Sequence, residues 1–504
     1  MRKAYFRKAS FKWHRKLTWI GLFAVLMFAV SALTHPLLSW TGPQAANFRP
    51  PNTVINAQQV RSIATVLKRH NIQQALVVKL VPSARGVVLQ VTDSATAPRR
   101  YFDLASGTEL PNYDQQHAAW LAQYYVAGDS PLAIKSIRFQ TEFDSAYPWV
   151  NRLLPVYKVE FSDAANSSAY IYTEINALAG MGNDYKTQLQ AVFRNLHTWA
   201  WLDHVDGARI IVMALLLLSI FALSAAGVGL LLMLRARKNM PRKTKLHRFT
   251  GYVVALPLLA FCVSGFWHLL HYGFNETNRG LKLGEPMLLA SLNENVSLAD
   301  LPDVPLNQVS VVSYNDQLYY RLGFPAMARA NVKPASVSSG GEHAHHDMSS
   351  DVASRTARFK GQPTEHAGLY FAAKTGQQSD LNDEQLAQAL ASQYLQLDNS
   401  QITSSTLITR FGLHYDFRNK RLPVWQIDVD SDVGDKVFID PTTGMLVDRL
   451  VNKDRYEAYS FGFLHKWNFL TPLMGRFWRD MLVVVILSLI ILLSLLGVAM
   501  RLKR

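Results

Sequence analysis

Apolar residues are concentrated in four long runs separated by polar stretches, and each run is long enough to cross a lipid bilayer. A hydrocarbon core of roughly 30 Å is spanned by about 20 helical residues. The apolar centre of each run contains no Asp, Glu, Lys or Arg. The pattern therefore predicts transmembrane helices at residues 17–40, 209–234, 249–274 and 480–500.

Two longer segments between these runs, residues 41–208 and 275–479, have the patterns of folded α+β domains. Alternating apolar and polar positions predict half-buried strands, apolar residues at helical spacing predict helices, and a strand that runs into a glycine-containing tight turn recurs. Strands are expected at 75–81, 86–91 and 424–429, helices at 56–70 and 383–395, and strand-turn units at 101–107, 370–376 and 437–444. Each segment is long enough to bury a core of its own.

The basic residues are distributed in a way that fixes the expected orientation of the chain. Seven Lys or Arg and no acid precede the first span, seven more and no acid lie in residues 235–248, and three follow the last span. Removing these 17 charges from the net +15 leaves −2 for the rest of the chain. The positive-inside rule places residues 1–16, 235–248 and 501–504 in the bacterial cytoplasm and the two long segments in the periplasm. Nucleic-acid binding, which requires a basic face on a folded domain, is excluded.

The N-terminus also allows a second interpretation. A basic start, an apolar run and the small residues Val30, Ser31 and Ala32 resemble a cleavable signal peptide. The run is longer than the h-region of about 7 to 15 residues in such peptides. We expect an uncleaved first span, because the internal repeat of the chain requires it.

The first and third spans repeat the same arrangement of histidines. A His-Arg pair opens the first span at His14, and His35 closes it 21 residues later. A second His-Arg pair opens the third span at His247, and His268 follows at the same separation of 21 residues. The two spans therefore carry equivalent histidines at equivalent depths.

The outer segments repeat as well. Residues 154–161 resemble residues 422–429 at an offset of 268, and the same offset aligns the Leu-His-x-Trp motif of His197 with that of His465. Both halves begin and end on the same side of the membrane, so we expect parallel repeats related by a pseudo-two-fold axis along the membrane normal. The predicted fold is four transmembrane helices in two parallel pseudo-symmetric pairs, with two large periplasmic α+β domains.

These features resemble the PepSY-associated transmembrane-helix family, often described as iron-regulated or iron-uptake inner-membrane proteins. The resemblance rests on the two His-Arg starts, the strand-turn phrase at residues 440–444 and the two Leu-His-x-Trp motifs, and it covers nearly the whole chain. It implies PepSY-like domains at 41–208 and 275–479. Some members are similar to haem-containing ferric-siderophore reductases, so the resemblance implies a ferric siderophore or another periplasmic iron complex as partner.

The duplicated histidines are the strongest candidates for a cofactor site. A haem with two axial histidines needs imidazoles from facing helices inside an apolar bundle. At 1.5 Å per residue, His14 and His35 lie about 31 Å apart, one near each membrane face. We predict two b-type haems, an inner one held by His14 and His247 and an outer one held by His35 and His268. A single histidine at a helix end would instead be explained by snorkelling or capping.

Three further histidines leave alternatives open. His271, one turn beyond His268, could replace it as a ligand. His197 and His465 could ligate the outer haem, line a substrate pocket or pack structurally between helix and domain.

A histidine-rich segment lies between Gly- and Ser-rich stretches in the second outer domain. His343, His345 and His346 have metal-binding composition, but their flanks favour a solvated loop over a preformed metal site. We expect residues 333–358 to form a mobile loop whose histidines bind a metal ion only weakly.

The sequence as a whole favours an electron-transfer protein that passes electrons through haem to a periplasmic iron complex, a ferric siderophore above all. The chain has no nucleotide-binding glycine loop, Cys-x-x-Cys, catalytic Ser motif or His-Glu-x-x-His. The electron donor is not identified by any motif. Two other hypotheses are a non-enzymatic regulator that binds a peptide or protease, and a transporter whose paired spans line a substrate path.

Overall fold

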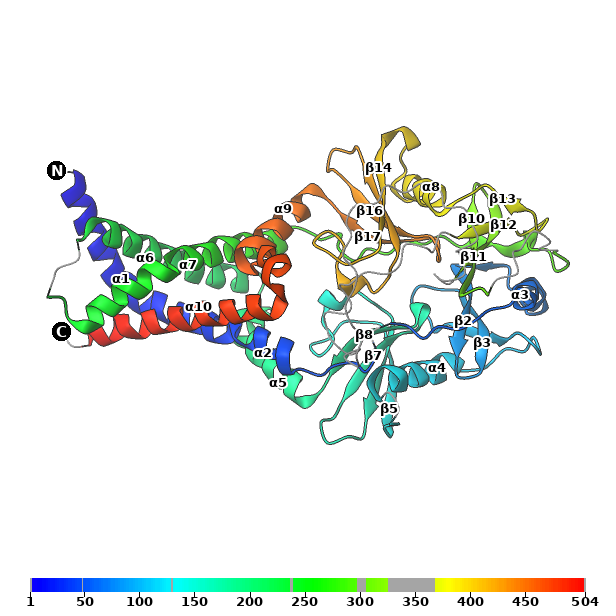
Figure 1. The fold of residues 1–504 in the computed structure, drawn as a ribbon, viewed down its shortest axis with the longest axis horizontal. Coiled ribbons are helices and arrows are strands. Elements are labelled where there is room, and N and C mark those ends of the chain that lie inside the picture. The colour runs from blue at the N-terminus through cyan, green and yellow to red at the C-terminus, as the bar shows by residue number, and fades with distance from the viewer. Residues whose placement is uncertain are drawn as a thin grey trace. The chain divides into compact units, whose positions relative to one another are not determined.

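The computed structural model describes residues 2–47, 49–127, 130–235, 239–296, 305–324 and 368–502. The chain divides into two compact units (Figure 1). The helical unit consists of Met1–Gly42, Asp184–Thr277 and Lys453–Arg504. The sheet unit consists of Pro43–Asn183 and Asn278–Asn452. The predicted loop 333–358, with His343, His345 and His346, lies outside the described residues.

Long apolar helices form the helical unit. Among the described residues, four helical stretches are long and apolar enough to cross a membrane, which confirms the four predicted spans. They are α1 (Arg2–Ala32) with its continuation α2 (Thr34–Thr41), α6 (Ala208–Met233), α7 (Arg242–Phe274) and α10 (Thr471–Arg501). Helix α1 packs against α6 and α10, and α7 packs against the same two helices. Small and branched residues such as Ala24, Val254 and Ile490 fill the interior, while large apolar side chains such as Leu215 and Leu256 face outwards, as expected for helices in lipid.

Two short helices that end in a π-turn also belong to the helical unit, although they follow the strands of the outer segments in sequence. Helix α5 (Asp184–Val192) continues into the π-helix η4 (Phe193–His197), and α9 (Asn452–Ser460) continues into the π-helix η11 (Phe461–His465). Both π-helices are followed by a tryptophan in the left-handed backbone conformation, Trp199 at φ 52° and Trp467 at φ 53°. Such a backbone is uncommon for a bulky residue, so this turn is held in place by its surroundings.

The sheet unit contains two similar four-stranded antiparallel sheets, each preceded by a helix in the described chain. The first comprises α4 (Tyr113–Ala122), β5 (Ile134–Gln140), β6 (Val156–Phe161), β7 (Ser168–Tyr172) and β8 (Ala177–Gly182). The second comprises α8 (Asp383–Leu395), β14 (Ile402–Ile408), β15 (Val424–Val429), β16 (Lys436–Asp440) and β17 (Met445–Leu450). Both sheets have strands in sequence order, bulges at matching places, and a cis proline at the start of the second strand, Pro155 and Pro423.

A third sheet joins the two halves of the chain. Within the described residues it has seven strands in the order β13-β12-β11-β10-β2-β3-β4. They are β2 (Val77–Ser83), β3 (Gly86–Thr92), β4 (Arg100–Asp103), β10 (Gln308–Tyr314), β11 (Gln317–Gly323), β12 (Leu369–Ala372) and β13 (Gln378–Ser379). Strands β10 and β2 pair antiparallel, with Val311 opposite Val78. The two outer segments therefore share one hydrogen-bonded sheet.

Helix α3 (Ala57–Arg69) supplies apolar side chains such as Val60 and Ile63 to the core that also contains residues of this shared sheet. A short additional ribbon pairs β1 (Gln74–Ala75) with β9 (Met287–Leu288). The helices predicted at 56–70 and 383–395 are confirmed as α3 and α8, and both begin with a capping box. The turn glycines of the predicted strand-turn units have positive φ, +67° at Gly107, +79° at Gly376 and +65° at Gly444.

A buried ion pair ties the shared sheet to α8. The guanidinium of Arg321 donates to both carboxylate oxygens of Asp383, at 2.8 Å from Nε and 2.8 Å from Nη2. The hydroxyl of Tyr370 and the backbone N–H of Gly368 donate to the same carboxylate. Burial opposes ionisation, but Arg321 keeps the pKa of Asp383 below its ordinary value.

We predict that Arg321→Met lowers the free energy of unfolding of the sheet unit by about 3–5 kcal/mol, because it leaves a carboxylate buried without its cation. The measurement is urea-induced unfolding of the purified protein in detergent. The double variant Arg321→Met/Asp383→Leu should recover much of this loss. Lys68→Met, which removes a cation from the exposed pair Lys68–Glu294, serves as control and should change the free energy by less than about 1 kcal/mol. An equal loss of unfolding free energy in Arg321→Met and Lys68→Met would contradict the stabilising role assigned to the buried pair.

Candidate functional site

The helical unit brings His14 and His247 together, as the sequence predicts for the inner site. His14 lies on α1 and His247 on α7, and their ring centroids are 6.4 Å apart at an interplanar angle of 66°. The Nδ1 atom of His14 lies 3.2 Å from the carbonyl oxygen of Leu223 on α6. The Nδ1 atom of His247 lies 3.2 Å from the carbonyl oxygen of Leu493 on α10. Each ring is therefore fixed by a backbone group of a neighbouring helix.

These carbonyl contacts determine which ring nitrogen carries the proton. A carbonyl oxygen can only accept a hydrogen bond, so Nδ1 must be the protonated nitrogen in both rings. The Nε2 atoms of His14 and His247 then keep a free lone pair, which is the form of imidazole that binds a metal. In their neutral form, both rings would therefore present Nε2 as the ligand atom.

Glycines on the neighbouring helices leave room beside both rings. A Cβ built at Gly227 would lie 3.4 Å from Cε1 of His14, and one built at Gly497 would lie 3.5 Å from Cε1 of His247. Cε1 is bonded to Nε2, so the space kept open lies next to the nitrogen with the free lone pair. A larger residue at either glycine would crowd this position.

A second histidine pair is formed by the two π-helices. His197 of η4 and His465 of η11 have ring centroids 6.4 Å apart, at an interplanar angle of 81°. Phe193 stacks on His197 and Phe461 stacks on His465, each at a centroid distance of 4.6 Å. The separation equals that of His14 and His247, although these rings are held by different elements.

Two serines set the tautomer of this second pair. Nδ1 of His197 lies 3.1 Å from Oγ of Ser31, and Nδ1 of His465 lies 3.1 Å from Oγ of Ser264. Ser31 donates its hydroxyl hydrogen to the carbonyl of Met27, and Ser264 donates its own to the carbonyl of Ala260. A hydroxyl has one hydrogen to donate, so each serine accepts from Nδ1–H and Nε2 again keeps a free lone pair.

His268 and His271 have other partners. Nδ1 of His268 lies 2.5 Å from a carboxylate oxygen of Glu457, and Nε2 of His271 lies 2.9 Å from one of Asp454. His268 also stacks on Phe461 at 4.0 Å. Asp454 occupies Nε2 of His271, whereas Glu457 accepts from Nδ1–H of His268 and leaves its Nε2 free, so this hydrogen bond does not count against His268. The outer pair of His197 and His465 is favoured over the predicted His35 and His268 because its rings lie close together, with centroids 6.4 Å apart.

The sequence contained a signal for this second pair. The Leu-His-x-Trp motifs place His197 and His465 at the repeat offset of 268, and the serines that hold them also recur, Ser31 and Ser264. What the sequence could not give was the direction in which these histidines point. Side chains of His35 on α2 and of His204 are exposed.

The pairs are spaced as two ligands of one metal ion would be. A bond between a metal ion and an imidazole nitrogen is about 2 Å long, and that nitrogen lies about 1 Å from the ring centroid. Two imidazoles on opposite sides of one metal ion therefore have centroids about 6 Å apart. The observed separation of 6.4 Å in both pairs fits this arrangement.

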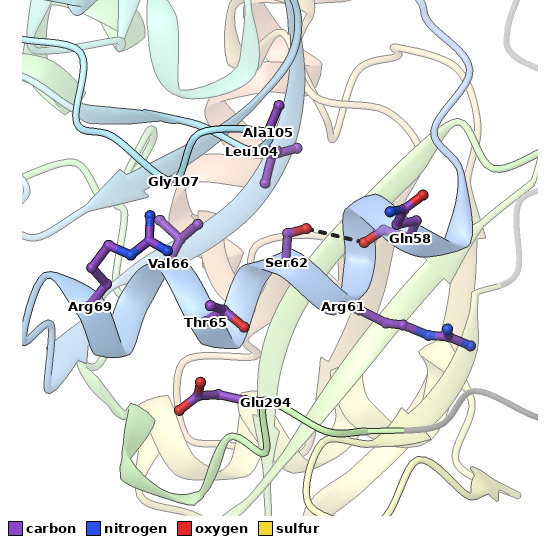
Figure 2. A pocket seen from close by; sticks show the side chains of 10 residues that line it. All are labelled: Gln58, Arg61, Ser62, Thr65, Val66, Arg69, Leu104, Ala105, Gly107 and Glu294. Carbon is purple, nitrogen blue, oxygen red and sulfur yellow. Dashed lines mark hydrogen bonds between the residues drawn. The ribbon is translucent and has the colours of Figure 1, made fainter.

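A shallow hollow of about 270 Å³ lies on the sheet unit, beside α3 and the turn after β4 (Figure 2). Its lining residues are Gln58, Arg61, Ser62, Thr65, Val66, Arg69, Leu104, Ala105, Gly107 and Glu294. The guanidinium of Arg69 donates to the backbone carbonyl of Ser106 at 2.7 Å, and Glu294 pairs with Lys68. Two of its charged groups, Arg69 and Glu294, are thus already engaged, and we assign the hollow no chemical role.

Comparison with known families gives one match. A family model described as "PepSY-associated TM region" matches residues 11–357, more than half of the chain. This match confirms the family expected from the repeated histidine and strand-turn motifs. No curated protein matches the chain.

Proposed function

Because the chain belongs to the family of PepSY-associated TM regions and is a multi-pass membrane protein, we propose that it carries electrons across the bacterial inner membrane through two haems. The proposed acceptor is a periplasmic iron complex, most suitably a ferric siderophore. The observation that carries this proposal is the presence of two pairs of imidazoles, each with a centroid separation of 6.4 Å and with Nδ1 of both rings at a hydrogen-bond acceptor.

Each histidine pair fits the ligand requirement of a b-type haem. Each pair would supply two imidazole nitrogens to the iron of a bound haem. When bound, the haem iron supplies one-electron redox chemistry, which amino-acid side chains at these positions do not provide. The inner site would be held by His14 and His247, and the outer site by His197 and His465.

The chain itself orients these ligands within its apolar helical bundle. Carbonyls of Leu223 and Leu493 fix the inner rings, while Ser31 and Ser264 fix the outer rings. The surrounding interior consists of apolar side chains. Hydrogen bonds from Nδ1–H to such acceptors increase the basicity of the ligand nitrogen and hold its orientation.

The two sites lie far apart along the bundle. His14 and Ser31 stand 17 residues apart on α1, and His247 and Ser264 stand 17 residues apart on α7. At 1.5 Å per residue, this separation is about 26 Å. One site per membrane face is what transfer across a hydrocarbon core of roughly 30 Å requires.

The distribution of basic residues indicates the orientation of the chain in the membrane. The positive-inside rule puts the His14–His247 pair at the cytoplasmic face and the His197–His465 pair at the periplasmic face. In this orientation the sheet unit is periplasmic and the halves are parallel repeats. The matched partners Leu223 with Leu493 and Gly227 with Gly497 support such a relation.

Iron release needs no general acid or base in this proposal. Hard oxygen ligands of a siderophore bind ferric iron more strongly than ferrous iron, so reduction alone weakens the complex. One electron passes to the ferric ion, which becomes ferrous.

We predict that the protein, purified after expression with sufficient haem, shows a Soret band and contains two haems per chain. His14→Ala, His247→Ala, His197→Ala and His465→Ala should each reduce the content to one. The measurement is a reduced-minus-oxidised spectrum with haem quantification. His204→Ala, at an exposed histidine of the same unit, is the control and should retain two haems.

His35→Ala and His268→Ala distinguish the two possible outer pairs. Both should retain two haems if His197 and His465 are the ligands. Loss of one haem in either variant would instead support the outer pair expected from the sequence, His35 with His268. A protein without a Soret band would leave the regulator and the transporter as the remaining hypotheses.

We predict that Ser31→Ala and Ser264→Ala raise the midpoint potential of one haem and leave that of the other unchanged. Removal of the serine hydroxyl weakens the hydrogen bonding of Nδ1–H, although for His197 the carbonyl of Phe28 remains at 3.2 Å, and so makes the imidazole a weaker donor to ferric iron. A difference of one hydrogen bond corresponds to a shift on the order of tens of millivolts. Potentiometric titration followed by absorbance measures it. Ser219→Ala is the control, because Ser219 donates to a carbonyl of its own helix, Leu216.

We predict that vesicles containing the haem-loaded protein, reduced from the cytoplasmic face, release ferrous iron from a membrane-impermeant ferric siderophore on the other side. A ferrous-specific chelator in the outer solution gives the rate. His14→Ala should lower this rate at least about tenfold, since it removes a ligand of the site that first receives the electron. Protein that is reduced but never reoxidised by the siderophore would contradict the proposed acceptor while leaving the haem sites intact.

A further inference from the structure

A cluster of buried charges lies in the sheet unit, separate in sequence from every histidine of the two pairs. It contains the cations Lys79, Arg99, Lys282 and Arg421 around the carboxylate of Glu174, and we call it the charge cluster. Lys79 comes from β2, Arg99 precedes β4, Glu174 follows β7, and Arg421 precedes β15. Three sheets therefore contribute to one point of the interior.

Glu174 is the centre of the cluster. Nη2 of Arg99 lies 3.6 Å from its Oε2, and Arg421 donates to its Oε1. Lys79 donates to its backbone carbonyl, and the hydroxyl of Tyr172 donates to Oε2 at 2.9 Å. Burial alone would raise the pKa of Glu174, but Arg421 and Arg99 hold this pKa well below its ordinary value.

The charges around Glu174 do not balance. Two further carboxylates act on the cluster, Asp440, which accepts from Arg421 at 2.7 Å, and Asp114, which accepts from the backbone N–H of Arg99 at 3.0 Å. Four cations thus face three carboxylates, and one positive charge is left over. Burying an uncompensated charge is costly, so the surplus requires a counter-charge or the loss of a proton.

Several nitrogen atoms in the cluster have no partner among the described residues. Nε and Nη1 of Arg99 and Nε of Arg421 are buried without a hydrogen bond in the described chain, although Arg99 is only 4% exposed. The ammonium group of Lys282 lies over the ring of Tyr172, at 4.5 Å from its centroid. Donors without acceptors and an excess of positive charge occur at the same place.

We propose that the charge cluster binds one small anion, either chloride or a carboxylate group, which accepts hydrogen bonds from Arg99 and Lys282. One negative charge brings the sum of the seven charged side chains to zero. Both candidate ligands share the required chemistry, a single negative charge on a small acceptor. This proposal is independent of haem binding.

The alternative way to remove the surplus is to deprotonate a lysine. Burial lowers the pKa of Lys282 to about 7 and that of Lys79 to about 8. Burial also lowers the pKa of His117 to about 4 and raises those of Tyr101 and Tyr172, so these neighbours are neutral between pH 6 and pH 9. Below pH 7 both lysines are charged and the anion is needed. Between pH 7 and pH 8 the loss of the Lys282 proton balances the cluster, and above pH 8 the loss of the Lys79 proton as well leaves one negative charge, which disfavours an anion.

The test measures the thermal unfolding of the purified full chain at increasing concentrations of chloride or acetate. The salt of a bulky sulfonate makes up the difference, so that the ionic strength stays constant. A ligand that binds only the folded state raises the unfolding temperature by equal steps for each tenfold increase above its dissociation constant. We expect such steps at pH 6. At pH 9 the anion should bind about 100-fold more weakly, because the apparent dissociation constant rises about tenfold per pH unit above the pKa of Lys282 near 7.

Lys282→Met removes the surplus charge and should abolish the anion dependence at pH 6. Lys68→Met removes an exposed cation of the same unit and should keep it. Steps with chloride alone identify an inorganic anion, and steps with acetate alone identify a carboxylate. The proposal is overturned if neither anion shifts the wild-type transition, if Lys282→Met keeps the full dependence, or if the apparent dissociation constant of the wild type is the same at pH 6 and pH 9. The comparison of pH values needs no variant, so a folding defect in Lys282→Met leaves the test decisive.

Discussion

Everything distinctive about the helical unit depends on satisfying the Nδ1–H group of four histidines inside an apolar bundle. An imidazole N–H without an acceptor is costly in such surroundings, so each ring can only be placed where another helix presents an acceptor. For His14 and His247 the acceptors are the carbonyls of Leu223 and Leu493, each four residues before a glycine that leaves space beside the ring. The same hydrogen bonds therefore select the tautomer, orient the ring and fix which helices pack together.

The second histidine pair is built by irregular backbone rather than by a regular helix face. Each π-helix places a phenylalanine against the histidine at its end, and the following tryptophan turns the chain with a positive φ. The indole N–H of Trp199 donates to the carbonyl of Leu196, and that of Trp467 donates to the carbonyl of Leu464, which satisfies carbonyls left by the π-turn. π-turns are rare and frequent at functional sites, and their double occurrence is in accord with a shared role for His197 and His465.

Local patterns predicted the four spans, α3, α8 and the turn glycines, because apolar spacing and φ requirements act over a few residues. The pairing of His14 with His247 could also be predicted, since the repeat sets their depth. The partner of His268 could not be predicted, because the 21-residue spacing says nothing about Glu457, which approaches from α9, 189 positions later. The shared sheet was missed for the same reason. Its β10–β2 pairing joins Val311 to Val78, and no local pattern records so distant a contact.

Each histidine pair takes one residue from each half of the chain, and this has a consequence for what a single half can do. The first half contributes His14 and His197, and the second contributes His247 and His465. The acceptor of each ring, by contrast, comes from the same half as the ring, as with Ser31 for His197 and Ser264 for His465. One half can therefore orient its own imidazoles but cannot place two of them around one centre. The duplication supplies the second ligand, and the seven-stranded sheet shared by the described strands of both halves links them within the sheet unit.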